Sequence, residues 1–219
     1  MGLKYLSLDD SLYGYVCKSC SAASDPVLGA LRKETEELGD ISKMQISEEQ
    51  GAFMKLLVAA IGAKCVIEVG TFTGYSSLCM ARALPQNGRL ICIDESAEWT
   101  AIARKYWAKA GVEERIELRL GPAIPLLQQL EAELTFDFVF LDADKTEYDA
   151  CYELLLPRVR PNGLILFDNM LWGGRLGRGP IKEASGHAID ALNQKLAHDA
   201  RVETVLLPIA DGLQLCRKI

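Results

Sequence analysis

The chain has 219 residues, of which 49% are hydrophobic, and its 24 Lys and Arg against 30 Asp and Glu give a net charge of −6. This composition supplies a sizeable apolar core and excludes a disordered chain or a small disulfide-stapled scaffold. The acidic balance argues against nucleic acid as a partner, because binding a phosphate backbone requires a cationic surface. The longest apolar stretch, residues 56–63, is far shorter than the ~20 residues that span a bilayer, so we expect no membrane partner.

The cysteines and the N-terminal sequence indicate a reduced compartment. The seven cysteines are an odd number and are scattered, and Asp9 and Asp10 interrupt any signal-peptide pattern, so we expect a cytoplasmic protein with free thiols. Cys17 and Cys20 form a Cys-x-x-Cys pair. Zinc is not expected there, because the chain has only two histidines and no second such pair. A redox pair is not expected either, because the two thiols would lie in a helix outside any thioredoxin-like unit.

Residues 1–62 are predicted to form N-terminal helices. Asp25 is a helix cap that precedes a proline at the first helical position, and residues 47–50 (Ser-Glu-Glu-Gln) form a capping box that predicts a second helix start. No repeat, low-complexity tract or linker separates this segment from residues 63–219. We therefore expect one domain that spans residues 1–219, with its core in the second part.

From residue 63 onward, short apolar runs alternate with helical stretches. Near-continuous apolar strands separated by helices indicate an α/β fold, in which a doubly wound parallel sheet has helices on both faces. A short turn around Asp211 and Gly212 separates the last two runs and leaves no room for a crossover helix, so the last strand is predicted to be antiparallel. The expected strands are residues 65–69, 89–94, 115–120, 136–141, 163–167, 202–207 and 213–217, and the expected helices are residues 75–83, 97–110, 124–130 and 147–156.

Open parallel sheets bind ligands beyond the carboxyl ends of their strands, so the strand ends are the candidate site. The first strand ends in a loop with glycines at 70 and 74, which allow a tight turn and close approach of the backbone to a ligand. This loop is neither the Gly-x-Gly-x-x-Gly dinucleotide fingerprint nor a phosphate loop. With the acidic Glu68 before it, the loop suits a ligand that carries an ammonium group and no phosphate. A plain β-to-α turn is the alternative interpretation.

Further strand ends carry acidic or amide side chains. Asp94 offers two acceptor oxygens to a ribose diol, or else caps the helix that follows. Asp142 ends the fourth strand, and Asp168 and Asn169 end its expected neighbour. This all-oxygen set suits Mg²⁺, Mn²⁺ or Ca²⁺, although each residue alone can be a helix cap or a turn residue. Lys145 is either a salt-bridge partner of these carboxylates or a catalytic base.

Taken together, these motifs resemble the cation-dependent O-methyltransferases of the caffeoyl-CoA and catechol O-methyltransferase group, which use S-adenosylmethionine. The resemblance implies a Rossmann-like sheet of seven strands whose last strand is antiparallel. Asn162 and Ala210 stand where this family usually has glycine, but both are turn positions. The motifs that carry the resemblance are residues 66–77, Asp94, residues 121–123, residues 136–145 and residues 168–174, within a similarity that extends from residue 44 to residue 213.

The resemblance also implies roles for individual residues. The S-adenosylmethionine pocket would be lined by Ile46, Gly70, Thr71, Ser76, Ala123 and Asp142, with Glu68 facing the amino-acid part of the cofactor and Asp94 its ribose. Asp142, Asp168 and Asn169 would hold the divalent cation. Lys145, together with Asp142, would form the catalytic group near the acceptor hydroxyl.

The implied reaction is methyl transfer from S-adenosylmethionine to a hydroxyl of a catechol-like or phenolic small molecule. The cation would lower the pKa of that hydroxyl and Lys145 would accept its proton. One alternative is a nicotinamide-dependent oxidoreductase, against which the missing third glycine argues. A methyltransferase acting on protein or nucleic acid is disfavoured by the acidic balance, and a catalytically silent S-adenosylmethionine-binding protein is disfavoured by the intact acidic set.

Two further expectations concern surfaces. Acceptor selectivity is expected in the N-terminal segment and in the glycine-rich loop of residues 172–186, which is also a candidate cover. The apolar positions Leu12, Tyr13, Tyr15 and Val16 exceed what a free segment exposes, and related enzymes pair, so we expect a homodimer.

Overall fold

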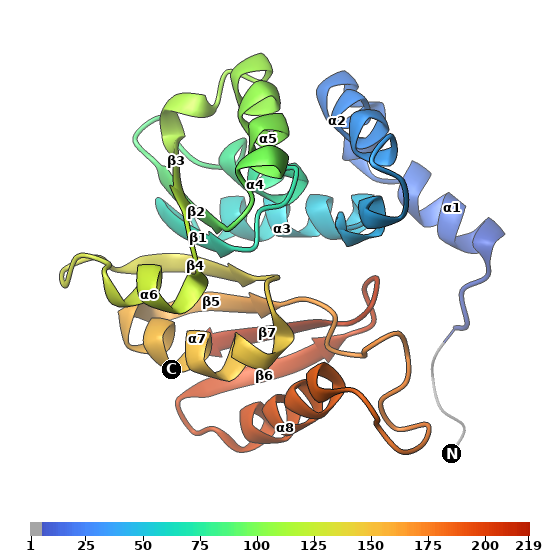
Figure 1. Ribbon diagram of the computed structural model, residues 1–219, viewed down its shortest axis with the longest axis vertical. Coiled ribbons are helices and arrows are strands. Elements are labelled where there is room, and N and C mark those ends of the chain that lie inside the picture. The colour runs from blue at the N-terminus through green and yellow to red at the C-terminus, as the bar shows by residue number, and fades with distance from the viewer. Residues whose placement is uncertain (1–5) are drawn as a thin grey trace.

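The computed structural model describes residues 6–219, without the side chains of residues 22 and 23. Residues 1–5, where the predicted N-terminal helical segment begins, lie outside the described residues. A seven-stranded sheet runs through the molecule in the order β3-β2-β1-β4-β5-β7-β6 (Figure 1). Its strands are β1 (Cys65–Val69), β2 (Arg89–Asp94), β3 (Ile116–Leu120), β4 (Phe136–Leu141), β5 (Val159–Phe167), β6 (Val202–Leu207) and β7 (Leu213–Lys218).

The strand directions agree with the prediction. β1 to β5 pair in parallel, whereas β7 lies antiparallel to both of its neighbours, β5 and β6. The turn before β7 is tight, because Gly212 donates its N–H to the Ile209 carbonyl oxygen at 2.8 Å and has a φ of +89°. The doubly wound sheet with an antiparallel last strand is therefore confirmed.

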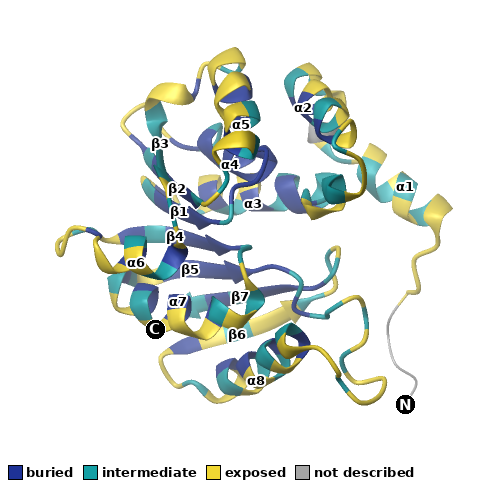
Figure 2. Ribbon diagram, viewed as in Figure 1, coloured by how far each residue is buried: buried dark blue, intermediate teal, exposed yellow. Residues whose placement is uncertain are grey.

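Helices cover both faces of the sheet. In Figure 1, α2 to α5 lie on one face and α6 to α8 on the other. Successive strand residues alternate between two buried clusters: Val66 packs under the first set of helices and Ile67 under the second. Figure 2 shows the resulting band of buried strands. The helices are α1 (Asp10–Lys18), α2 (Pro26–Glu36), α3 (Glu48–Ala60), α4 (Tyr75–Ala81), α5 (Ala97–Lys109), α6 (Ala123–Gln128), α7 (Tyr148–Leu155) and α8 (Ala184–His198).

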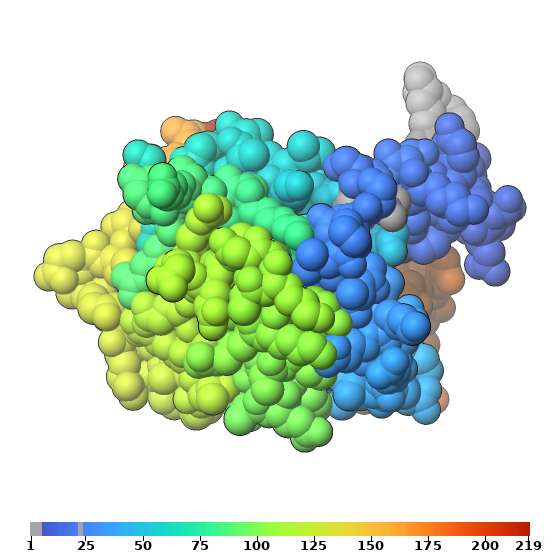
Figure 3. Space-filling model, turned by 90° about the horizontal axis from the view of Figure 1, so that it is seen from above, coloured from blue at the N-terminus to red at the C-terminus, as the bar shows by residue number. Residues whose placement is uncertain are grey.

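The N-terminal segment folds back onto the core. α2 lies beside α5, where the Tyr106 hydroxyl donates to the Glu34 carboxylate at 2.7 Å and to the Ala30 carbonyl oxygen at 3.0 Å (Figure 3). Asp25 caps α2 as predicted, with its Oδ1 accepting from Val27 N and Leu28 N at 3.0 and 3.1 Å. This packing brings the stretch between α2 and α3 over the carboxyl edge of the sheet.

The structure corrects one detail of the predicted start of α3. Ser47 is the N-cap residue, but within the described part of the chain it makes no side-chain capping bond. The Gln50 side chain also makes no bond back to the Ser47 backbone, because it is buried against a cavity at the strand ends. The helix start was therefore predicted correctly, but the reciprocal capping box does not form.

Two elements at the C-terminal side go beyond the prediction. α8 was not predicted, although its buried residues Ile189, Leu192 and Leu196 recur at helical spacing. The helix begins at Ala184, so it includes the last residues of the expected 172–186 loop. β5 begins at Val159 rather than at residue 163, because Val159 pairs with Phe136 before a register shift in that strand pair. No helix among residues 6–219 is long and apolar enough to cross a membrane.

Candidate active site

A cavity of about 850 Å³ opens at the carboxyl ends of β1, β2, β4 and β5. This is the edge where an open parallel sheet binds its ligands, and the volume suits a cofactor together with a small molecule. Residues 43–47 and Gln50, from the N-terminal segment, close the side opposite the strand ends. The cavity therefore has one wall from the sheet and one from the N-terminal helices.

The β1–α4 loop forms the floor of the cavity and depends on its glycines. Gly70 has a φ of +90°, and a Cβ there would lie 2.1 Å from the carbonyl oxygen of Asp142. Gly74 has a φ of +85°, and a Cβ there would lie 2.5 Å from the Ala103 side chain. Such approaches are possible only without a side chain. The loop is thus pressed against the end of β4 and against α5, which places Thr71 on the cavity surface.

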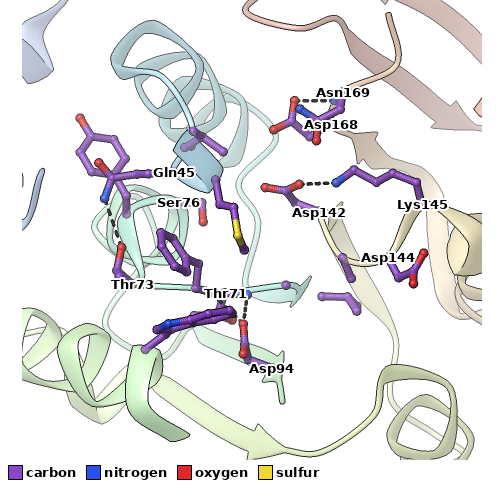
Figure 4. Close-up of a pocket in the computed structure, with 18 of the residues that line it drawn as sticks. Gln45, Thr71, Thr73, Ser76, Asp94, Asp142, Asp144, Lys145, Asp168 and Asn169 are labelled. Atoms are coloured by element: carbon purple, nitrogen blue, oxygen red, sulfur yellow. Dashed lines mark hydrogen bonds and ion pairs between the residues drawn. The ribbon is translucent and has the colours of Figure 1, made fainter. Parts of the chain in front are cut away.

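Asp94 ends β2 and holds the same loop. Its Oδ2 accepts hydrogen bonds from the backbone N–H groups of Thr71 and Phe72 at 2.9 and 2.8 Å, and its Oδ1 accepts from Ser96 N at 2.8 Å (Figure 4). The capping alternative does not hold for Asp94, because Ser96 is the N-cap of α5, with its Oγ accepting from Trp99 N at 3.1 Å. Asp94 also lines the cavity.

Glu68 occupies a different position from the one predicted for a contact residue. It is fully buried and is not among the described residues that line the cavity. Its Oε2 accepts from Cys92 Sγ at 3.5 Å, and among residues 6–219 its Oε1 has no hydrogen-bond partner. Burial raises the pKa of Glu68 to about 7, while the Ser76 and Thr71 side chains act in the opposite direction. Glu68 therefore lies directly behind cavity-lining residues.

The predicted cation set converges on one side of the cavity. Asp142 follows β4 and Asp168 follows β5, and because these strands are parallel neighbours, their ends lie together (Figure 4). Lys145 Nζ lies 2.8 Å from Asp142 Oδ1, and Asp168 Oδ1 accepts from Asn169 N at 2.7 Å. Lys145 pairs with the carboxylate, as a salt-bridge partner does, and it also lines the cavity, as a catalytic base must.

The electrostatics of this set fit a cation. Burial, and secondly the charge of Asp142, raise the pKa of Asp168 to about 7. Burial also raises the pKa of Asp142, while Lys145 counteracts it. Two partly desolvated carboxylates that repel each other are stabilised in their ionised form by a positive charge between them. Within residues 6–219 no three His, Cys, Asp or Glu side chains gather as a metal cluster, and the candidate ligands here are two carboxylates and the Asn169 amide.

The structure brings together nearly all of the predicted site residues. The cavity lining includes Ile46, Gly70, Thr71, Ser76, Asp94, Ala123, Asp142, Lys145, Asp168 and Asn169. It also includes residues that sequence reasoning missed, among them Phe72 and Trp99, whose rings meet edge to face at 5.2 Å beside Asp94. Gln50 was missed as well, whereas Trp172 lies in the 172–186 loop that was expected to contact the acceptor. An aromatic at the start of the helix after Asp94 was the available signal for Trp99, whereas nothing in the local sequence marks Gln50.

Cys17 and Cys20 lie away from this site. Cys17 belongs to α1, where its Sγ contacts the Glu49 carboxylate at 3.6 Å beside the Tyr13 hydroxyl, which donates to the same carboxylate at 3.0 Å. Burial raises the pKa of both thiols. All seven cysteines are free, and the contacts of Cys17 and Tyr13 with Glu49 join α1 to α3.

Comparison with known proteins identifies the protein family to which the chain belongs. A sequence profile of a family described as O-methyltransferase matches residues 18–219. Two solved structures share the fold: the O-methyltransferase TomG from Streptomyces achromogenes in complex with SAM (TM-score 0.85, 27% identity, covering 95% of this chain and 96% of that one), and an O-methyltransferase from Bacillus cereus in complex with SAH (TM-score 0.86, 29% identity, covering 95% and 97%). The chain belongs to the O-methyltransferase family.

Curated relatives of the chain include caffeoyl-CoA O-methyltransferases. "Probable caffeoyl-CoA O-methyltransferase 2" from Dictyostelium discoideum is 47% identical over 180 residues, covering 80% of this chain and 78% of that protein. "Caffeoyl-CoA O-methyltransferase 2" from Zea mays is 38% identical over 229 residues, covering 100% and 87%. The predicted resemblance to this family is therefore confirmed, and neither the oxidoreductase nor the silent binding protein is favoured.

Proposed function

We propose that this S-adenosylmethionine-dependent O-methyltransferase methylates a hydroxyl of a catechol-like or phenolic small molecule, assisted by Mg²⁺, Mn²⁺ or Ca²⁺. The observation that carries this proposal is the convergence of Asp142, Asp168 and Asn169 at one side of a cavity, with Lys145 bound to Asp142. These three residues would hold the cation. The names of the curated relatives, caffeoyl-CoA O-methyltransferases, support a phenolic acceptor.

The cofactor would occupy the part of the cavity between the β1–α4 loop and Asp94. Two related structures that contain SAM and SAH support this cofactor. Asp94 would bind the ribose hydroxyls, and Ile46, Gly70, Thr71, Ser76 and Ala123 would form the walls. Glu68 would act from behind the wall, as a buried negative charge that favours the cofactor's ammonium group.

The chemistry assigned to the protein is positioning and proton transfer. A bound divalent cation lowers the pKa of a hydroxyl that it contacts. Lys145 would accept the hydroxyl proton at Nζ, which lies against Asp142 at the cavity wall. The acceptor oxygen then forms its bond to the methyl carbon as the carbon–sulfur bond of the cofactor breaks. The remaining contribution is the alignment of the two reactants by the cavity walls.

Acceptor selectivity would come from the N-terminal wall and from the 172–186 loop. Met44 and Gln45 line the cavity from the first, and Trp172 lines it from the second. Trp172 has a φ of +50° and is followed by glycines at positive φ, so the loop turns sharply where it leaves the cavity. This arrangement supports the loop as a cover over the acceptor.

A panel assay tests the proposed reaction. Purified protein, S-adenosylmethionine and Mg²⁺ are incubated with catechols, flavonoids and CoA thioesters of phenolic acids, each paired with an analogue that lacks one of the two adjacent hydroxyls. Mass spectrometry should show methylation of at least one vicinal diol and much slower reaction of its single-hydroxyl analogue. Methylation of no member, or equal rates for both members of each pair, would contradict the proposal.

A further inference from the structure

Cys17 and Cys20 lie at the end of α1 and not together inside a helix. α1 ends at Lys18, with Ser19 as its C-cap residue, so Cys20 lies beyond the helix. The expectation that both thiols lie in a helix is therefore wrong for Cys20. Since that expectation was part of the reason against a redox pair, the chemistry of the two thiols depends on their local geometry.

A tight turn joins the two cysteines. The backbone N–H of Cys20 donates to the Cys17 carbonyl oxygen at 3.1 Å. A turn closed by such a bond keeps the Cα atoms of its first and fourth residues within about 7 Å of each other. Disulfides span Cα separations of about 4.4–6.8 Å, so this backbone allows a bond between the two sulfur atoms without unfolding the turn.

The two thiols are accessible to a small reagent. Cys17 and Cys20 are both half-buried. Cys65 is half-buried too, but it lies in β1, between β2 and β4. The remaining cysteines are buried: Cys79, Cys92, Cys151 and Cys216. We therefore expect an oxidant in solution to reach the pair at the end of α1 before the other thiols.

Glu49, in the first turn of α3, controls the chemistry of the pair. Its carboxylate accepts a hydrogen bond from Cys17 Sγ at 3.6 Å and from the Tyr13 hydroxyl at 3.0 Å. Burial, and then the charge of Glu49, raises the pKa of both thiols. The thiolate is the form that attacks a disulfide, and a nearby carboxylate disfavours that form. Glu49 therefore holds the pair in its protonated, slowly reacting form.

We propose that Cys17 and Cys20 are a modification site, at which glutathione disulfide oxidises the two thiols to an intramolecular disulfide at a rate that Glu49 restrains. In a reducing compartment such a bond is transient, which suits a reversible modification. The oxidised Cys17 has no S–H left to donate to Glu49, so the bond also removes one contact between α1 and α3.

The reaction proceeds by two exchanges. The thiolate of one cysteine attacks a sulfur atom of glutathione disulfide; a bond between protein and glutathione forms, the glutathione S–S bond breaks, and one glutathione leaves. The thiolate of the other cysteine then attacks the mixed disulfide and releases the second glutathione. The two protein thiols lose two electrons and two protons in total, and glutathione disulfide takes up both to become two glutathione thiols.

Oxidation of the reduced full chain with glutathione disulfide, quenched with N-ethylmaleimide, tests the site. Trypsin cleaves after Lys18, so the disulfide joins the peptide of residues 5–18 to that of residues 19–32, which mass spectrometry detects. We expect this linked pair, at the mass of one chain on a non-reducing gel, before any other cysteine reacts. A disulfide between two chains, adducts on single cysteines only, or earlier modification of Cys65 would contradict the proposal.

Serine variants test the two exchanges separately. Cys17→Ser and Cys20→Ser should each abolish the linked peptides, and the variant that keeps the attacking thiol should accumulate the glutathione adduct. Absence of an adduct in both variants would rule out the mixed disulfide as an intermediate and would contradict the proposed reaction.

The role of Glu49 has its own test. Glu49→Gln keeps the shape and removes the charge, so oxidation should be faster, by roughly threefold for each unit by which the thiol pKa falls. Tyr13→Phe is the matched control, because it breaks the other bond to this carboxylate and keeps the charge, so the rate should not rise. Equal acceleration in both variants would assign the effect to loosening of α1, and no acceleration in Glu49→Gln would remove Glu49 from the proposal.

Discussion

Asp94 performs two structural tasks at the end of β2. Its Oδ2 holds the N–H groups of Thr71 and Phe72, and its Oδ1 holds the N–H of Ser96. The sequence pattern predicted an acceptor for a ribose at this position, but it could not show that the same carboxylate also fixes the β1–α4 loop. We therefore expect a substitution of Asp94 to disturb both the loop and the binding of a ligand in the cavity.

Asp94→Ala should weaken the binding of S-adenosylmethionine and S-adenosylhomocysteine by roughly ten- to hundredfold, because the loop bonds and the ribose acceptors are lost together. Isothermal titration calorimetry measures the effect. Glu98→Ala, at an exposed position of α5, is the control and should bind as the wild type does. Unchanged affinity in Asp94→Ala would remove Asp94 from the cofactor site.

Glu68 predicts a pH dependence of stability. Burial raises its pKa to about 7 in the folded protein from 4.5 in the unfolded chain. Its contribution to stability is therefore complete below pH 4.5 and is lost as the pH rises through about 7. For the ligand-free protein this loss should be on the order of 3 kcal/mol.

Glu68→Gln removes this titration, so its free energy of unfolding should vary less between about pH 5 and about pH 8 than that of the wild type. Urea denaturation at the two pH values measures the difference. An equal pH dependence in both proteins would show that Glu68 is ionised at no cost inside the fold.

At the scale of elements, the β1–α4 loop depends on the absence of a side chain at Gly70. An alanine there would place its Cβ 2.1 Å from the Asp142 carbonyl oxygen, at a φ of +90°. Gly111 has a φ of +66° with nothing within 4 Å of a built Cβ, so it isolates the backbone strain alone. Comparing alanine substitutions at Gly70 and Gly111 therefore separates the cost of steric overlap from the cost of a positive φ.

Gly70→Ala should lower the free energy of unfolding by roughly 3 kcal/mol or more, whereas Gly111→Ala should lower it by about 1 kcal/mol. Urea denaturation followed by circular dichroism provides both values. Equal losses in the two variants would mean that the loop can move away from β4 without penalty.

The strand-end residues could be predicted because parallel strands place their carboxyl ends at one edge, so Asp94, Asp142 and Asp168 follow from the positions of the strand boundaries. The position of Gln50 in the cavity wall could not be predicted, because it depends on how α3 packs against α4. α8 was missed although its apolar residues recur at helical spacing, since the glycine-rich stretch before it indicated a loop. Ala210, with a φ of +46°, lies in the turn before β7 as expected, whereas Asn162, with a φ of +62°, lies within β5 and not in a turn before it. Both residues have the positive φ that glycine adopts most readily, which fits the expectation of glycine at these positions.

At the scale of the whole molecule, the exposed apolar side chains support a homodimer, which stays a prediction. α1 exposes 69% of Tyr15, and α3, which packs against α1, exposes 69% of Leu56. Light scattering at micromolar concentration should give the mass of two chains, and a Tyr15→Glu, Leu56→Glu variant should give one. A monomeric mass for the wild-type protein would contradict the proposal.

The cytoplasmic location and the single domain also stay predictions.

We propose that methyl transfer requires a divalent cation held by Asp142, Asp168 and Asn169. The proposed cofactor walls lie mainly at the ends of β1 and β2 and on the N-terminal segment, so removal of the cation should leave cofactor binding nearly intact. Asp168→Asn keeps the shape of the side chain and removes one charge, so it should lower the affinity for the cation and greatly reduce the turnover rate. Lys145→Ala should reduce turnover more than cation affinity.

Turnover in the presence of excess EDTA, with a methyl acceptor identified by the panel assay, is the most direct measurement of this claim. We predict that EDTA abolishes methylation, that Mg²⁺ or Mn²⁺ restores it, and that affinity for S-adenosylhomocysteine changes little throughout. Full methylation activity in excess EDTA would contradict the account, and it would leave a cation-independent methyltransferase in which Lys145 acts as a general base.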